Sequence, residues 1–125
     1  MRMSINDLYQ IEKFQINDKT IFAQIILNAG HEIFSGHFPG QPVLPGVCMV
    51  QIVKVLLEKV VEADLSLERA DQIKFLRVID PRQTAQFEAK LEFEWIDEKQ
   101  VRAVGSFLNG DTVYFKLQGG VFCKS

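Results

Sequence analysis

The chain has few cysteines and no pair of them at a metal-ligand spacing. Its 125 residues include only Cys48 and Cys123, which are far apart in the sequence. A disulfide framework or a zinc site would require cysteines or histidines at characteristic spacings. We therefore expect no metal and no cofactor, and this cysteine usage is typical of a protein from a reducing cytoplasm.

Positive charge and long apolar runs are also scarce. Fourteen Lys and Arg stand against sixteen Asp and Glu, for a formal charge of −2, without the basic excess of a nucleic-acid-binding protein. Polar residues interrupt the most apolar stretch, residues 47–61, so it is well short of the roughly 18 apolar residues of a membrane span. The first residues contain neither the apolar block of a signal peptide nor an Arg-rich transit pattern. We expect a soluble protein with no nucleic-acid or membrane partner.

The overall composition is that of an ordinary globular protein. Hydrophobic residues make up 47% of the chain and charged residues 24%, which is close to average usage. A chain of this length supports one hydrophobic core. We therefore expect a single domain over residues 1–125.

Alternation of apolar and polar residues predicts strands. It is cleanest over residues 86–95, where five apolar residues alternate with five polar ones, as in a strand with one buried face. Strands are also predicted at 20–27, 72–79, 100–108 and 112–123. Asn109-Gly110-Asp111 suits a tight hairpin between the last two, and Asp80-Pro81-Arg82 suits a turn after residue 79.

One long helix is predicted, from Gly46 to about Glu62, because a run of helix-forming residues follows Pro45. At 100° per residue nearly all of its polar side chains fall on one stripe, and the remaining faces are apolar. Such a helix must be surrounded. We expect an α+β fold, in which a curved antiparallel sheet of five to six strands wraps one long central helix. The stripe consists of Gln51, Lys54, Glu58 and Glu62.

Residues 34–47 concentrate three of the four prolines and three of the eight glycines of the chain. Prolines fix φ and withhold N–H donors, whereas glycines permit positive φ or a close approach. The segment ends at the start of the predicted helix, where unpaired N–H groups carry partial positive charge. That helix start is suited to bind an oxygen on which negative charge develops.

The run Gly36-His37-Phe38-Pro39-Gly40-x-Pro42-Val43-Leu44-Pro45-Gly46-Val47 resembles the signature of the β-hydroxyacyl-(acyl carrier protein) dehydratases of type II fatty acid synthesis. The resemblance implies the hotdog fold, acyl carrier protein as a partner and an obligate homodimer with two sites at the subunit interface. A trimer of dimers, or pairing with a paralogue, stays open. In this family the histidine matched by His37 is the base, and the N–H matched by Gly46 holds the thioester carbonyl.

The sequence departs from this family at one catalytic position. The family acid comes 14 residues after the histidine, where this chain has Gln51. A glutamine amide can orient a hydroxyl by hydrogen bonds but has no carboxylic proton to give. Losing a general acid typically costs on the order of 10²–10⁴ in rate. Alternatively, Gln51 is simply a solvated or interface position on the polar stripe.

Three functions remain open at this point. The first is a dehydratase of 3-hydroxyacyl thioesters, whose turnover would be impaired because Gln51 replaces the acid. The second is a non-catalytic subunit that binds acyl carrier protein or an active paralogue. The third is a thioesterase on the same fold, for which the segment offers few groups to activate water.

Other residues are candidates for binding. The resemblance places substrate along the loop and the helix start, whereas three basic residues close together could receive an acidic carrier protein, although a solvated face is the usual role of such residues. Cys48 and His31 are expected to be structural. The substrate-binding candidates are Phe38, Pro39, Gly40, Val47 and Phe75, and the carrier-docking candidates are Lys74, Arg77 and Arg82.

Overall fold

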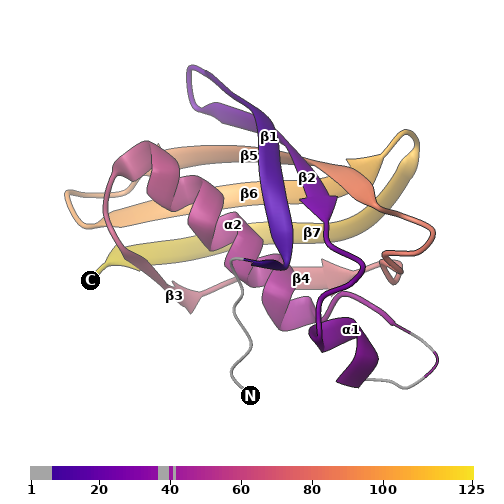
Figure 1. Ribbon diagram of the computed structural model, residues 1–125. Helices are drawn as coiled ribbons and strands as arrows, with labels where there is room; N and C mark the ends of the chain where they lie inside the picture. The colour runs from indigo at the N-terminus through magenta and orange to yellow at the C-terminus, as the bar shows by residue number, and fades with distance from the viewer. Residues whose placement is uncertain (1–6, 37–39, 41) are drawn as a thin grey trace.

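Seven strands form one antiparallel sheet, and a 16-residue helix lies across one of its faces (Figure 1). This computed structural model describes residues 7–36, 40 and 42–125. The predicted α+β arrangement is confirmed, but the predicted number of five to six strands is wrong. The elements are β1 (Tyr9–Asn17), β2 (Thr20–Leu27), α1 (Ile33–Gly36), α2 (Gly46–Val61), β3 (Leu65–Arg69), β4 (Gln72–Phe75), β5 (Gln86–Trp95), β6 (Gln100–Asn109) and β7 (Thr112–Lys124).

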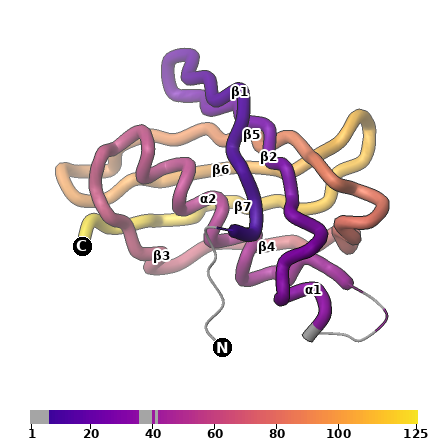
Figure 2. The backbone as a smooth tube through the Cα atoms, in the orientation of Figure 1, coloured from indigo at the N-terminus to yellow at the C-terminus, as the bar shows by residue number. Residues whose placement is uncertain are grey.

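The strand order is β1-β2-β5-β6-β7-β3, and β4 also pairs with β7. The two short strands β3 and β4 therefore share one long neighbour: β3 pairs with residues 121–124 and β4 with residues 115–118. The chain between β2 and β5 supplies α1, α2 and both of these edge strands (Figure 2). The start of α2 at Gly46 lies beside the end of β4, where it meets the Phe75 ring.

The two strands absent from the prediction are β1 and β3. Alternation in β1 slips by one residue at Lys13, which has a φ of 50° and lies where the pairing register with β2 shifts. Such a bulge absorbs the extra residue and restores the alternation beyond it. In β3 only Leu65 is fully buried, so its sequence carries little hydrophobic pattern.

The predicted strand over 72–79 ends early, at Phe75. The backbone N–H groups of Leu76 and Arg77 both donate to the Tyr114 carbonyl, at 2.9 and 3.3 Å. One acceptor serving two successive donors ends the regular ladder. The predicted turn that follows is confirmed, because the N–H groups of Gln83 and Thr84 donate to the Asp80 carbonyl.

The predicted helix is confirmed as α2, with Glu62 as its left-handed C-cap at a φ of 54°. Gln51, Lys54 and Glu58 of its polar stripe are half-buried, whereas Glu62 is exposed. Lys54 Nζ lies 3.5 Å from Glu58 Oε2, which also accepts the N–H of Leu65 at 2.8 Å. The buried side of α2 belongs to the hydrophobic core, which also contains phenylalanines of β5, β6 and β7. Within the described ranges, neither helix is long and apolar enough to cross a membrane. The buried residues of α2 are Cys48, Met49, Ile52, Val53, Leu56 and Leu57.

Candidate functional site

The N-terminus of α2 has no side-chain cap. Its N-cap is Pro45, in an extended conformation with φ −63° and ψ 147°. The Pro45 carbonyl accepts the N–H groups of Cys48 and Met49, at 3.0 and 3.3 Å. Within the part of the chain that the structure describes, the N–H groups of Gly46 and Val47 have no acceptor. Two donors at the positive end of the helix are therefore available to an oxygen from outside.

Phe75 lies against the first residue of this helix. A Cβ atom built on Gly46 would lie 2.7 Å from Cζ and 2.8 Å from Cε1 of the Phe75 ring. Only glycine fits without movement of the ring. Val47, the next residue, is 76% exposed. Three predicted site residues, Gly46, Val47 and Phe75, thus come together at one end of α2.

A backbone hydrogen bond holds the proline-rich segment in place before α2. The N–H of Leu44 donates to the carbonyl of Ile79 at 2.8 Å, and both side chains are buried in the core. The chain leading into α2 is therefore fixed to the segment that follows β4. Gly40, another predicted residue, has a φ of 84°, a left-handed conformation that favours glycine.

A row of phenylalanines connects this end of α2 with the core. The ring centroids of Phe75 and Phe115 are 5.6 Å apart, those of Phe115 and Phe107 are 4.8 Å apart, and those of Phe107 and Phe87 are 4.9 Å apart. The last three rings are fully buried, whereas Phe75 is 54% exposed. Phe75 is therefore the outer member of the row, packed on Phe115 on one side and on Gly46 at its tip.

Gln51 lies farther along α2 and is half-buried. Among the described residues its amide has no hydrogen-bond partner. His37, Phe38 and Pro39 lie outside the described residues, and their places as base and substrate contacts stay predictions.

The predicted docking residues differ in how far their charges are paired. Arg82 holds Asp80 through Nη2 and Nε, at 2.9 and 3.2 Å. The hydrogen bonds from Arg82 lower the pKa of Asp80, and the bond to Asp80 raises the pKa of Arg82. Arg77 is exposed just after β4.

Lys74 has no such partner and faces another lysine. On β4 it stands directly opposite Lys116 on β7; both are exposed, and neither has an ion pair within the described ranges. Like charges placed directly opposite destabilise a sheet, so the pair leaves two uncompensated positive charges side by side. Lys116 is not identifiable from the sequence alone, because strand register brings it beside Lys74. Only its place on the polar face of the strand could have indicated it.

Cys48 and His31 have the structural environments that the sequence predicts. Cys48 is 3% exposed in the first turn of α2, and burial raises the pKa of its thiol. A raised pKa disfavours the nucleophilic thiolate. His31 is also buried, and its ring is hydrogen-bonded to the backbone of Ile33.

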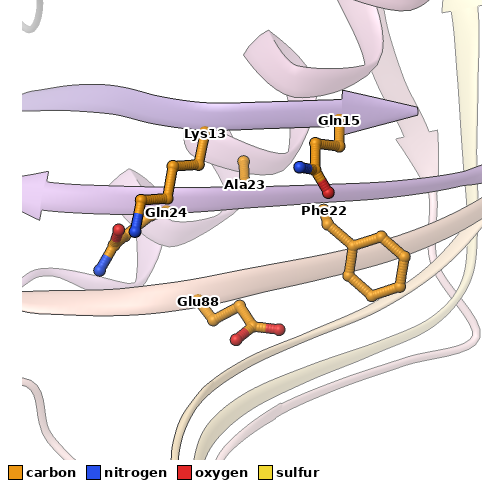
Figure 3. A pocket seen from close by; sticks show the side chains of 6 residues that line it. All are labelled: Lys13, Gln15, Phe22, Ala23, Gln24 and Glu88. Carbon is orange, nitrogen blue, oxygen red and sulfur yellow. The ribbon is translucent and has the colours of Figure 1, made fainter. Parts of the chain in front are cut away.

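A separate groove lies on the face of the sheet that α2 does not cover. Its volume is about 350 Å³, and Figure 3 shows the side chains around it, with the Phe22 ring and the Glu88 carboxylate on neighbouring strands. The β1 bulge at Lys13 forms part of its rim. The groove contains none of the predicted site residues. Its lining residues are Lys13, Gln15, Phe22, Ala23, Gln24 and Glu88.

Known dehydratases resemble this chain in sequence. A family model described as ApeI-like, for the ApeI dehydratase, matches residues 13–106. The 3-hydroxyacyl-(acyl-carrier-protein) dehydratase FabZ of Shewanella sediminis is 30% identical over 117 residues, which cover 86% of this chain and 70% of that protein. FabZ of Chlamydia trachomatis is 28% identical over 113 residues, which cover 83% of this chain and 72% of the relative.

Solved structures share the fold at lower identity. The dehydratase heterocomplex ApeI:P from Xenorhabdus doucetiae matches with a TM-score of 0.71 and 19% identity, over 93% of this chain and 98% of that one. A mutant thioesterase from Pseudomonas aeruginosa matches with a TM-score of 0.66 and 12% identity, over 98% of this chain and 87% of that one. The fold is therefore shared by proteins named as dehydratases and as thioesterases.

Proposed function

Because the chain belongs to the ApeI-like dehydratase family and is related to the FabZ dehydratases, we propose that it removes water from a 3-hydroxyacyl group. The group would be carried as a thioester on acyl carrier protein, in cytoplasmic synthesis of a fatty acid or a polyketide-type product. The observation that carries the proposal is the pair of N–H groups at Gly46 and Val47, which have no acceptor among the described residues.

These donors suit the thioester carbonyl. Removal of the C2 proton gives an enolate-like species, in which negative charge develops on the thioester oxygen. Backbone N–H groups at a helix N-terminus stabilise such a charge without reorganisation. The Gly46 N–H is the proposed oxyanion donor. Val47 and Phe75 beside it would contact the acyl chain, together with Phe38, Pro39 and Gly40.

His37 is the proposed base. A neutral imidazole can accept the C2 proton near neutral pH, since its unperturbed pKa is about 6.5. The C2–H electron pair then forms the C2–C3 double bond as the C3–O bond breaks. The departing hydroxyl takes up one proton to leave as water, and the imidazolium of His37 can return the proton that it accepted. The reaction therefore balances without an additional acid.

Gln51 would orient the C3 hydroxyl. Its amide has no partner among the described residues, and it can both donate to and accept from a hydroxyl. It lacks the proton that a carboxylic acid would give to the leaving group. We accordingly expect turnover to be slow.

A second copy of the chain would complete the site. Side chains at the α2 start and after β4 expose large apolar surface, which isolated domains seldom present as a patch. We propose a homodimer through this region, with assembly into a trimer of dimers or pairing with a paralogue as further forms. The exposed residues are Val47 at 76%, Phe75 at 54%, Leu76 at 48% and Val78 at 71%.

The acidic carrier would dock on the basic residues beside this edge. Lys74, Arg77 and Arg82 are the proposed contacts. Lys74 has no ion pair within the described ranges and stands opposite Lys116 across the strand pair. The charge of Arg82 is already engaged with Asp80 at 2.9 Å. Lys74 is therefore the expected principal contact.

Two observations favour a second candidate, a non-catalytic subunit that pairs with an active paralogue. Gln51 has no carboxylic proton, and the relative in the Xenorhabdus doucetiae structure is described as part of a dehydratase heterocomplex. In this alternative the same surfaces would bind the carrier or the paralogue, but the site would perform no chemistry.

A two-direction assay tests the proposal. The wild-type chain and His37→Ala are given 3-hydroxyacyl and enoyl thioesters of acyl carrier protein, and free thiol is followed in parallel. Interconversion by the wild type, absent in His37→Ala at unchanged melting temperature, would support the dehydratase. Thiol release without interconversion would instead support a thioesterase. Neither reaction, with retained carrier binding, would support the non-catalytic subunit.

A further inference from the structure

His31 is a buried histidine that the proposed reaction does not use. It is 9% exposed, and its Nδ1 accepts a hydrogen bond from the backbone N–H of Ile33 at 3.0 Å. A ring nitrogen that accepts this bond carries no proton, so the neutral ring is protonated on Nε2. Its geometry resembles a helix cap, in which a side chain just before a helix satisfies a free N–H.

The turn around His31 is tied to the beginning of β1. The N–H of His31 donates to the Asn28 carbonyl at 3.0 Å. The Asn28 side chain in turn donates to the Asp7 carbonyl at 2.9 Å and accepts the Gly30 N–H at 3.0 Å. The backbone that carries the His31 ring is therefore held from two directions.

Helix α1 depends on this anchor. It has only four residues, from Ile33 to Gly36, and a single helical turn is unstable on its own because nucleation is costly. The His31 ring holds the N–H of Ile33, and the His31 carbonyl accepts the N–H of Phe34 at 3.1 Å. The Phe34 side chain is 4% exposed in the core.

The last residue of α1 directly precedes His37 in the chain. We propose that His31 is a positioning residue: by capping α1 through Nδ1, it fixes the backbone from which the base follows. The inference rests on the proposed function, in which His37 is that base. A misplacement of about 1 Å at a reacting group can cost roughly a hundredfold in rate. Loss of a helix cap next to the base is therefore expected to lower turnover.

Two substitutions separate the Nδ1 acceptor from the rest of the ring. In His31→Asn the side-chain oxygen stands at the same number of bonds from the backbone as Nδ1. In His31→Gln the amide lies one bond farther out and misses that place. Glu32→Gln is the matched control, because Glu32 is the exposed neighbour in the same turn.

The ring signals of His37 give a readout that does not depend on turnover. The chain contains two histidines, so each His31 variant retains a single histidine to follow by NMR. We expect His31→Gln to shift the His37 ring signals and its titration midpoint, and to lower kcat by about tenfold to a hundredfold with little change in KM. His31→Asn and Glu32→Gln should keep the His37 signals and kcat close to their wild-type values.

The same data can overturn the inference. The inference fails if His31→Gln leaves the His37 signals and kcat unchanged. It also fails if His31→Asn lowers kcat and shifts the His37 signals as much as His31→Gln does. A wild type with no dehydratase turnover would refute the proposed function, while the His37 signals would still decide the positioning role. If His31→Gln does not fold, long-range ¹⁵N spectra of the wild type decide: a neutral His31 protonated on Nδ1 would refute the cap.

Discussion

The ring of Phe75, on the last residue of β4, lies against Gly46, the first residue of α2, so closely that a methyl group on Gly46 would overlap the ring. The contact joins a sheet edge to the proposed oxyanion donor. It also explains why a glycine stands at the helix start, where its φ is not positive and any residue could otherwise fit. Close packing, not backbone conformation, demands glycine here.

Gly46→Ala should therefore move Phe75. Because the ring is 54% exposed, it can rotate outward, and we expect a loss of about 1 kcal/mol in the free energy of unfolding, at the low end of overpacking. Turnover should fall much more than stability, since the acyl contact moves with the ring. Urea unfolding and kcat/KM measure the two effects. In a Phe75→Ala background Gly46→Ala should cost little further stability, because the overlapping ring is gone. Purely additive losses would contradict the packing argument.

The chain should be a dimer at micromolar concentration. Sedimentation should give about twice the chain mass of 14.3 kDa. Val78→Glu, in the exposed apolar patch after β4, should dissociate it because a charge would be buried in the interface. Val104→Glu is the control: Val104 is 47% exposed and lies on β6, and its substitution should leave the mass unchanged. A wild-type mass near 14 kDa would refute the shared site.

Much of this fold is predictable because its burial pattern is regular. In β5 every second residue up to Phe93 is buried, and the long helix follows from its apolar faces. The hairpin after β6 was predicted from Asn109-Gly110, although only Gly110 takes a positive φ. In β1 a bulge at Lys13 hides the alternation, and in β3 there is too little burial to leave a pattern.

The candidate site was predictable only where its residues form a pattern along the sequence. A dense run of prolines and glycines identifies the segment before α2, and with it Gly46 and Val47. The pairing of Lys74 with Lys116, and the capping of α1 by His31, depend on strand register and on local turns. Those are properties of the folded chain, which periodicity along one sequence does not contain.

Charge reversal at the β4 edge should affect carrier-bound substrate selectively. Lys74→Glu and Arg77→Glu should raise KM for carrier-bound substrate and weaken its salt dependence, because rim charges act through long-range attraction. Short soluble thioesters should react normally. Arg82→Gln should have a smaller effect, since its charge is already paired with Asp80. Lys99→Glu, in the exposed turn between β5 and β6, is the control, and equal effects on both substrate types would contradict docking.

Gln51→Glu tests whether the missing acid limits turnover, because it restores a carboxyl group at the position where the family has its catalytic acid. The substitution is nearly isosteric and disturbs packing little. Gln51 is half-buried, and partial burial raises the pKa of a carboxyl group, which helps to keep it protonated as a donor. If the amide only orients the hydroxyl, the new acid should raise turnover by one or more orders of magnitude, within the roughly 10²–10⁴ that a general acid supplies.

The outcome of Gln51→Glu also distinguishes the two candidate functions. Gln118→Glu, an exposed position on β7, makes the same chemical change away from the site and should leave turnover unaltered. In a non-catalytic subunit the remaining geometry would be too loose for the reaction, so restoring an acid should change nothing. Only a site that is still aligned for proton transfer can gain turnover from the new acid. The dehydratase proposal would therefore give way to the non-catalytic subunit if Gln51→Glu had the same turnover as the wild type and the wild type showed no turnover of carrier-bound substrate in either direction.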